Sequence, residues 1–260
     1  MRSILVHCQP GPAGAAQLQT ALSLARMTSG HVTALVATPV NHYATVDGLG
    51  GSVVAIDAMR EAIAADDAFA AEVKARLGRD DVPFSVIRAE SEPFDALVDA
   101  ARLADAVVVS RDDRLAGDLA LAVRCAVIAL GDDHALTFPL GSALVAWDGS
   151  SESCAALRAS LPLLAGCGQV AVVTVADKAP VWPATGALAY LSRHGIAAEL
   201  ESLERVGAVE DVLAAELALR GSDVLVMGAF GHSRVREYLF GGVTRALLDR
   251  RGSFALSLSH

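Results

Sequence analysis

Residues 222–245 read SDVLVMGAFGHSRVREYLFGGVTR, and this stretch carries the clearest structural signal in the chain. The apolar run from Asp223 to Met227 is typical of a buried strand, and it leads directly into Gly228-Ala229-Phe230-Gly231. After nine intervening residues, Gly241-Gly242-Val243-Thr244 open an expected helix. Glycine lets the backbone approach a ligand closely, and free N–H groups at a helix start attract an anion. The order of these segments predicts a phosphate-binding loop, although each glycine alone is equally well explained as a turn or cap residue.

Three pairs of strand-like segments indicate an internal repeat. Ser3-Ile4-Leu5-Val6 resembles Ser142-Ala143-Leu144-Val145, residues 31–36 resemble 169–174, and residues 105–109 resemble 223–227. The three offsets are 139, 138 and 118 residues. We therefore expect two similar halves, the second about twenty residues shorter between its second and fourth strands.

Short apolar runs alternate with helical patterns, which favours a doubly wound α/β fold with parallel strands buried on both faces. Strands are predicted near residues 3–8, 31–38, 83–89, 105–110, 125–130, 142–147, 169–176, 196–202, 222–228 and 253–258. Helices are predicted near residues 12–28, 53–78, 93–103, 115–122, 151–164, 184–194, 208–220 and 243–250. Residues 132–139 form the natural linker, so we expect one domain over 1–138 and another over 139–260.

The composition excludes several classes of protein. Of the 260 residues, 53% are hydrophobic and 20% are charged, which supplies a large core and argues against disorder. No apolar run approaches the roughly 20 residues that cross a bilayer, and the N-terminal run stops at Pro10, too short for a signal segment. We therefore expect a cytoplasmic protein without a membrane partner. The four cysteines lack C-x-x-C spacing, so neither a zinc site nor a disulfide framework is predicted.

The net charge of −9 is spread unevenly. Residues 1–140 hold 11 basic and 18 acidic side chains, whereas residues 141–260 hold 10 and 12. The last 33 residues, from Gly228 onward, carry five arginines and two acids. An acidic protein with one basic corner is a poor nucleic-acid binder and a suitable host for a small anion.

Three segments of the second half are expected to share one edge of its sheet. Ligands of open α/β sheets bind beyond the carboxyl ends of the strands, where the strand order reverses. The segments are Asp148-Gly149-Ser150, Val175-Ala176-Asp177 and Gly228–Gly231. Asp148 is a candidate to accept hydrogen bonds from a ribose or a base. The equally weighted alternative is that Asp148 caps the helix that starts near Ser151.

At these residues the chain resembles the universal stress protein family. The family motif places Gly, two residues, Gly, nine residues, Gly and then Ser or Thr after an apolar strand. Gly228, Gly231 and Gly241 match it, and Asp148-Gly149-Ser150 matches the family's Asp-Gly-Ser after the first strand. The similarity covers the second half well and the first half only by strand order, so the whole chain resembles a tandem member.

The resemblance implies two five-stranded, parallel, doubly wound domains of Rossmann-like, adenine nucleotide alpha hydrolase-like type. It also implies an ATP or AMP ligand, with Mg²⁺ as an optional companion, and pairing of domains through their last strands. The strands near 125–130 and 253–258 should then meet in an intrachain pseudo-dimer. The expected nucleotide-binding set is Asp148, Gly149, Val175, Gly228, Gly231, Ser233, Gly241, Gly242, Val243 and Thr244.

Two departures from the family pattern stand out. Gly242 occupies the Ser/Thr position, so the hydroxyl that could hold a phosphate or a metal is lost there, and Thr244 is the nearest substitute. The first half has Gln9 where Asp148 stands and Ser110-Arg111-Asp112-Asp113 where the glycine loop stands. Because acids repel a phosphate, we expect the first half to have lost the site and to serve as a structural partner.

Other candidates have competing explanations. Arg234 and Arg236 suit phosphate contacts, but a solvated helix face is the favoured explanation for each, and His232 is expected to be exposed. His7 is predicted to be buried, and Trp147 and Trp182 either belong to the core or flank a base. No motif supplies a nucleophile with an adjacent base or a metal-ligand set, so no catalytic or metal residues are assigned.

The sequence thus favours a stress-response module that binds an adenine nucleotide in its second half and acts as a sensor or regulator through protein partners that it does not identify. Two alternatives remain open: a ligand-free interaction scaffold, and a slow ATP hydrolase or nucleotidyl-transfer catalyst on the same fold.

Overall fold

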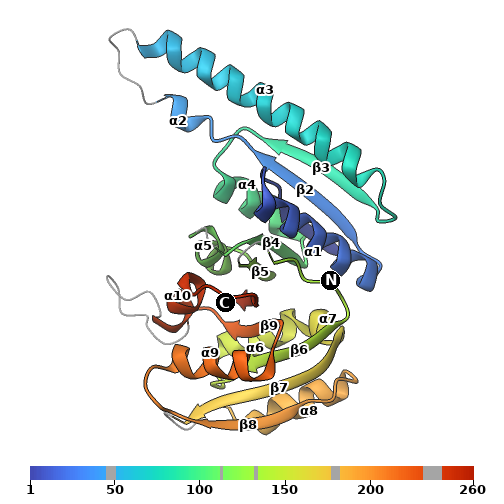
Figure 1. Cartoon of the computed structure of the whole chain (residues 1–260), viewed down its shortest axis with the longest axis vertical. Coiled ribbons are helices and arrows are strands. Elements are labelled where there is room, and N and C mark those ends of the chain that lie inside the picture. Colours follow the sequence, from blue (N-terminus) through green and yellow to red (C-terminus); the bar gives the residue numbers. More distant parts are fainter. Residues whose placement is uncertain (45–50, 112–113, 132–133, 177–181, 231–241) are drawn as a thin grey trace.

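A computed structural model describes residues 1–44, 51–111, 114–131, 134–176, 182–230 and 242–260, without the side chains of 44 and 51–55. Its strands form a single ten-stranded sheet in the order β3-β2-β1-β4-β5-β10-β9-β6-β7-β8. Figure 1 shows the N-terminal half (residues 1–138) in blue to green above the C-terminal half (139–260) in yellow to red. The predicted α/β class is confirmed.

The N-terminal half contributes one flank of the sheet. Its strands are β1 (Ser3–His7), β2 (His31–Ala37), β3 (Phe84–Ala89), β4 (Ala106–Ser110) and β5 (Ala126–Leu130). Its helices are α1 (Pro12–Thr28), α2 (Asn41–Ala44), α3 (Gly51–Leu77), α4 (Pro93–Ala100), the 3-10 turn η1 (Ala101–Leu103) and α5 (Leu115–Ala122).

The C-terminal half repeats the pattern. Its strands are β6 (Leu140–Ala146), β7 (Cys167–Ala176), β8 (Glu199–Glu204), β9 (Val224–Gly228) and β10 (Ala255–Ser259). Its helices are α6 (Ser151–Ala159), α7 (Leu161–Leu164), α8 (Ala184–Arg193), α9 (Val209–Arg220) and α10 (Gly242–Asp249).

Every predicted strand and helix is present, but two predictions need correction. The helix predicted over 151–164 is broken at Ser160 into α6 and α7. Pro162 explains the break, because proline lacks an N–H and its ring clashes with the carbonyl four residues before it. The strand predicted over 196–202 runs instead over Glu199–Glu204, in register with the end of β7.

The two halves join through their last strands. β10 pairs antiparallel with β5, with Ser257 opposite Ile128, whereas the other strand pairs are parallel. The predicted meeting of the strands near 125–130 and 253–258 is confirmed. As a result, the sheet runs without interruption from one half into the other.

Both faces of the sheet carry apolar cores that extend across the two halves. On one face α1, α3, α6, α7 and α8 pack onto the strands, and on the other face α4, α5, α9 and α10 do so. The strand pattern accounts for this arrangement: β4 and β5 are buried at every residue, as expected of parallel strands covered on both sides. Figure 1 shows α5 and α10 next to one another where the halves meet.

The segment between the second and third strands is longer in the N-terminal half, mainly because of one long helix. After β2 the N-terminal half has α2 and the 27-residue α3, whereas after β7 the C-terminal half has the 10-residue α8. Figure 1 shows α3 lying along β3 and extending beyond the sheet. Among the described side chains of α3, those that join the core lie in its C-terminal part: Ala70, Val73 and Leu77 are buried, and Phe69 packs against them partly buried.

The predicted linker is packed rather than loose in its described part, residues 134–139. Leu136 is 1% exposed, and its N–H donates to the hydroxyl of Thr20 on α1 (2.9 Å). The N–H of Phe138 donates to the hydroxyl of Ser23 on the same helix (2.9 Å). The linker therefore fixes the N-terminal half against the first strand of the C-terminal half.

The two halves contain equivalent aspartates, each bound to the start of the first strand of its half. The Oδ2 of Asp105 accepts hydrogen bonds from the N–H groups of Arg2 (2.6 Å) and Ser3 (3.0 Å). The Oδ2 of Asp223 accepts them from Gly141 (2.7 Å) and Ser142 (3.1 Å). Each Asp precedes the fourth strand of its half and binds the start of the first, so the offset of 118 residues reflects equivalent positions.

Candidate functional site

The C-terminal half reverses its strand order between β6 and β9. From β6 the chain continues outward to β7 and β8, then returns to place β9 and β10 on the other side of β6. Because β6 is parallel to both β7 and β9, the segments that follow these three strands lie at one edge. The structure thus brings Asp148, Val175 and Gly228 to the same edge of the sheet, and ligands of doubly wound folds bind at such a reversal.

Ser150, rather than Asp148, caps helix α6. The N–H of Ser153 donates to the Oγ of Ser150 (3.1 Å), which is the bond of a helix N-cap. Asp148 contacts the capping residue instead of the helix: its Oδ1 accepts hydrogen bonds from the Ser150 hydroxyl (2.6 Å) and from the Ser150 N–H (3.0 Å). Asp148 is exposed, so it positions the cap while facing solvent at the strand reversal.

Gly149 lies beneath the backbone of Trp182. Gly149 has φ +75°, and a Cβ there would lie 2.3 Å from the Trp182 nitrogen. The Trp182 carbonyl also accepts a hydrogen bond from Nε1 of Trp147 (3.0 Å). Trp147 is 5% exposed and belongs to the core, whereas Trp182 is 59% exposed. The question that the sequence left open is answered for Trp147, and Trp182 is held beside the edge by its main chain.

The glycine loop starts in close contact with α6. A Cβ on Gly228 would lie 2.7 Å from the nitrogen of Ser153 and from the carbonyl carbon of Glu152, so no other residue fits there without a shift. The strand pairing continues one residue further, since the Ala229 N–H donates to the Ser259 carbonyl (2.8 Å). Gly228 thus lets the end of β9 approach the first turn of α6.

Phe230 and Thr244 connect the loop to helix α10. Phe230 has φ +57°, a left-handed conformation that is uncommon for a side-chain-bearing residue. Its N–H donates to the Oγ1 of Thr244 (3.3 Å), a residue that is 3% exposed. Gly242 is exposed at the first position of α10, where an added Cβ would meet no atom within 4 Å, and Val243 is half-buried.

The remaining predicted residues are placed as follows. Val175 is half-buried near the end of β7 and pairs with Leu203 of β8. Gly231, Ser233 and Gly241 lie outside the described residues, as do His232, Arg234 and Arg236.

Glu152 and His260 add two polar groups at this edge that the sequence analysis did not single out. Nδ1 of His260 donates to the Ala229 carbonyl (2.9 Å). Burial by itself raises the pKa of Glu152, but its own backbone N–H, the Ser151 hydroxyl and the charge of His260 outweigh burial and hold that pKa below its usual value. Glu152 is therefore an ionised group next to the start of the glycine loop. A charged residue in the first turn after an Asp-Gly-Ser segment was the available signal.

The equivalent place in the N-terminal half is filled by Gln17. The half reverses its strand order between β1 and β4, and Gln17 of α1 is 1% exposed there. In the amide orientation that satisfies its neighbours, Gln17 donates to the His7 carbonyl at the end of β1 (2.5 Å) and accepts from the Ser110 N–H at the end of β4 (3.0 Å) and from Gln9 (3.2 Å). His7 is 6% exposed, so its predicted burial is confirmed.

Arg111, the residue after β4, extends into the C-terminal half. It is 3% exposed, and its guanidinium donates to the carbonyls of Gly252 (2.9 Å) and Phe254 (3.1 Å). The guanidinium carbon also lies 4.4 Å from the centre of the Phe254 ring. Asp112 and Asp113, whose repulsion of phosphate was expected, lie outside the described residues. An arginine directly after a buried strand that is apolar up to its last residue, Ser110, was the available signal for this role.

The buried cysteine thiols are unreactive. Burial raises the pKa of the thiols of Cys8 and Cys167 to about 12 and that of Cys125 to about 11, which leaves them protonated and weakly nucleophilic. Among the residues that the structure describes, no group of three His, Cys, Asp or Glu side chains is arranged to hold a metal ion. No helix in that part of the chain is both long and apolar enough to cross a membrane.

Solved structures share this architecture over the full chain. A universal stress protein from Archaeoglobus fulgidus superimposes with a TM-score of 0.72 at 14% identity, covering 99% of this chain and 96% of its own. A Pseudomonas aeruginosa protein assigned to the universal stress proteins gives 0.62 at 16% identity, with 100% and 93% covered. A second P. aeruginosa protein, of unknown function, gives 0.61 at 16%, with 100% and 92% covered.

The chain has the universal stress protein fold. The resemblance inferred from the glycine motif is thus confirmed at the level of the fold, including the tandem arrangement of two Rossmann-like halves. No protein-family sequence model matches the chain, and no curated protein matches it. The universal stress protein fold therefore rests on three-dimensional similarity, with sequence identity of 14% and 16% to the two full-length universal stress proteins above.

Proposed function

We propose that this protein is a two-domain universal stress protein that binds an adenine nucleotide of the ATP or AMP type in residues 139–260 and acts as a sensor or regulatory module. The observation that carries the proposal is the strand reversal between β6 and β9, which puts the Asp-Gly-Ser segment beside Gly228. The glycine motif, which is a local sequence pattern, and the fold of the whole chain both support the universal stress protein family.

Within this proposal the site residues divide by chemistry. We expect the phosphates to be bound by Gly228 and by the N–H groups of Gly242 and Val243 at the start of α10. Gly231, Ser233 and Gly241 are assigned to the phosphates from the sequence motif alone. Asp148 and Gly149 lie on the ribose side, and Val175 contacts the base. Thr244 acts indirectly, because its buried hydroxyl accepts the Phe230 N–H and so supports the loop from behind.

The N-terminal half, residues 1–138, serves as a structural partner without a nucleotide site. Two described contacts support this role. Gln17 satisfies the backbone groups at the β1–β4 reversal, and Arg111 is committed to the carbonyls of Gly252 and Phe254. In the described part of this region, the Ser110 N–H is paired with Gln17 and the Arg111 N–H with the Leu130 carbonyl (2.6 Å), so neither amide is available to a phosphate.

Isothermal titration of the purified protein with AMP, ADP and ATP tests the proposal. We expect heat from at least one nucleotide, together with a change in fluorescence of Trp182, which is 59% exposed and held beside Gly149. No heat from any of the three, at protein concentrations well above micromolar, would leave the ligand-free scaffold as the better explanation.

Two substitutions at one position sharpen this test. Gly242→Asp introduces a negative charge at the start of α10 without a steric clash, because an added Cβ meets no atom within 4 Å. Aspartate is favourable at a helix start, so the fold is preserved, while affinity for nucleotide should fall about tenfold or more through repulsion. Gly242→Ala is the matched control, and it should bind as the native chain does.

A further inference from the structure

We infer that the N-terminal half positions Phe230, at the start of the nucleotide loop of the C-terminal half, through a contact between Phe230 and Gly117. This inference rests on the proposed function and assigns the loop a positioning residue from the opposite half. Gly117 lies in α5 of the N-terminal half, and Phe230 immediately precedes Gly231 of the glycine motif.

The contact is close and specific in shape. A Cβ added to Gly117 would lie 3.3 Å from Cζ of Phe230 and 3.3 Å from Cδ1 of Leu248 on α10. The absence of a side chain at Gly117 therefore creates the space that the Phe230 ring occupies, between α5 and α10. A larger residue at position 117 must displace the ring or the leucine.

The backbone of Phe230 needs such support. With φ +57° it occupies a conformation that side-chain-bearing residues rarely adopt, and such conformations persist where the surrounding structure holds them. Contacts with both halves contribute this support: the Thr244 hydroxyl accepts its N–H at 3.3 Å, and the ring is seated on Gly117. One of these supports comes from each half of the chain.

Arg111 contacts the turn that follows the C-terminal end of α10. Helix α10 ends at Asp249, and the turn that follows it, Gly252 to Phe254, receives two hydrogen bonds and the stacked guanidinium of Arg111. The N-terminal half therefore contacts the segment that starts at Phe230 and the segment that follows α10. The position of α10, and of the amides at its start, depends on both halves.

This arrangement couples ligand binding to the pairing of the halves. The coupling is reciprocal: the free energy by which the contact of Phe230 with Gly117 favours nucleotide binding equals the free energy by which a bound nucleotide stabilises that contact. Binding should then reduce amide hydrogen exchange in α5 (Leu115–Ala122), although that helix belongs to the half without a site.

A double-mutant cycle tests the inference. Gly117→Val should weaken AMP binding at least tenfold, because valine fills the seat of the ring. Phe230→Gly removes the ring and tolerates the positive φ, so adding Gly117→Val to it should cost much less affinity than in the native chain, because the valine then meets Leu248 and no longer the ring. An equal loss from Gly117→Val in both backgrounds would overturn the inference. Gly117→Ala is a smaller version of the change for the case in which valine prevents folding.

The control and the ligand-free measurement separate the two proposals. Asp118→Val places the same residue at an exposed position of α5 and should leave AMP affinity unchanged. In nucleotide-free protein, Gly117→Val should accelerate exchange of the Phe230 amide at least tenfold, and an unchanged rate would overturn the positioning role. If the native chain binds no nucleotide, the proposed function fails, while this exchange measurement still decides whether Gly117 positions Phe230.

Discussion

The Oδ1 of Asp148 accepts a 2.6 Å hydrogen bond from the hydroxyl of Ser150, and that hydroxyl accepts the N–H of Ser153. The aspartate thus orients the residue that caps α6. The two roles that the sequence allowed for Asp148, helix cap and ligand contact, are divided between neighbouring residues, because Ser150 performs the capping.

This division predicts different effects of two substitutions. Ser150→Ala removes the cap and should lower the free energy of unfolding by about 1 kcal/mol, with a smaller loss for Asp148→Ala. Under the proposed function, Asp148→Ala should weaken nucleotide binding more than Ser150→Ala does. Urea denaturation and calorimetric titration of both variants measure the two quantities, and the same ranking in both experiments would contradict the division.

Gly242→Ser restores the hydroxyl that the family motif carries. Because Gly242 is exposed at the start of α10, a serine side chain fits without a clash. We expect affinity for ATP to rise by about threefold, one further neutral hydrogen bond, with less change for AMP. Titration with both nucleotides, with and without Mg²⁺, measures the change. Equal affinities for ATP before and after the substitution would place the phosphates elsewhere.

Gln17→Leu tests the filled strand reversal of the N-terminal half. The substitution removes a hydrogen-bond partner from the His7 carbonyl and from the Ser110 N–H, inside a site where Gln17 is 1% exposed. The free energy of unfolding should fall by about 2 kcal/mol. Gln9→Leu, which removes only one partner from Gln17, is the control and should cost less than half as much. Urea denaturation compares them.

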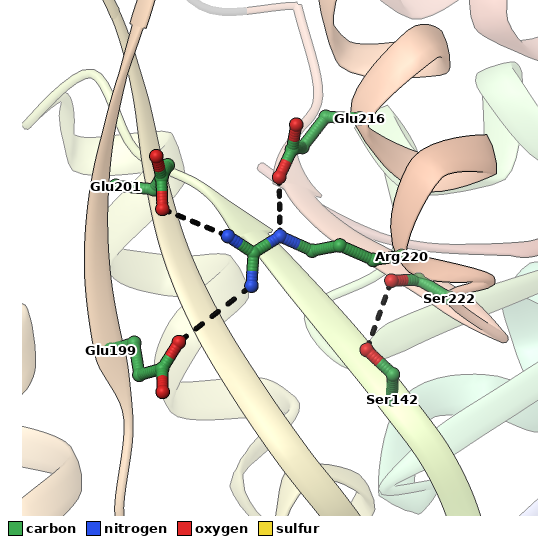
Figure 2. Close-up of polar contacts among 6 residues, drawn as sticks. All are labelled: Ser142, Glu199, Glu201, Glu216, Arg220 and Ser222. Carbon is green, nitrogen blue, oxygen red and sulfur yellow. Dashed lines mark hydrogen bonds and ion pairs between the residues drawn. The ribbon is translucent and has the colours of Figure 1, made fainter.

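Arg220 of α9 joins that helix to the edge strand β8 through Glu199 and Glu201, and it also pairs with Glu216 of its own helix (Figure 2). It donates to Glu216 of α9 and to Glu201 (2.9 Å), and it lies 3.7 Å from Glu199. The side chain of Glu216 is 10% exposed, so Arg220→Met leaves a largely buried carboxylate without its cation. The expected loss is about 2 kcal/mol of unfolding free energy, below the range for fully buried pairs because Arg220 is itself 25% exposed.

An exposed ion pair provides the control for Arg220. Arg245 and Asp249 on α10 lie 3.8 Å apart, with side chains 57% and 75% exposed. Arg245→Met should cost less than about 0.5 kcal/mol, as surface pairs do. Thermal or urea unfolding of both variants decides the matter, and equal effects would mean that burial of Glu216 is not the cause.

Asp105 makes stability depend on acid pH. Burial by itself raises its pKa, but hydrogen bonds from the N–H groups of Ser3 and Arg2 and the charge of the N-terminus outweigh burial and lower it. A lowered pKa in the folded state stabilises the protein above the unfolded value, near 3.9, and the contribution is lost as pH falls through the folded value. Because Asp105 is exposed and solvent screens its charge, Asp105→Asn should cost only about 0.5 kcal/mol at pH 7, and less near pH 3.

Urea denaturation of the native chain and of Asp105→Asn at the two pH values measures this dependence. Asp118→Asn, at an exposed position of α5, is the control and should cost little at either pH. A loss for Asp105→Asn that is the same at both pH values would show that the charge of the carboxylate is not involved.

The sequence by itself determined the strands, most helices, the internal repeat and the edge at which a ligand is expected. These features depend on local periodicity and on short motifs, so Asp223 to Gly228 could be recognised as a strand leading into a glycine loop. The break of the helix at Ser160 shows the limit of that approach, because one proline outweighed a continuous apolar pattern.

Only the tertiary structure decided how distant residues meet. Gln17 fills the strand reversal of one half, Arg111 reaches the turn after α10, and the ring of Phe230 is seated on Gly117, over separations of 141 and 113 residues in the last two cases. No local pattern encodes such contacts: those of Gln17 depend on the parallel pairing of β1 with β4, and those of Arg111 and Phe230 on the antiparallel pairing of β5 with β10, which brings the two halves together. Local propensity sets the elements, and long-range packing sets which side chains those elements bring into contact.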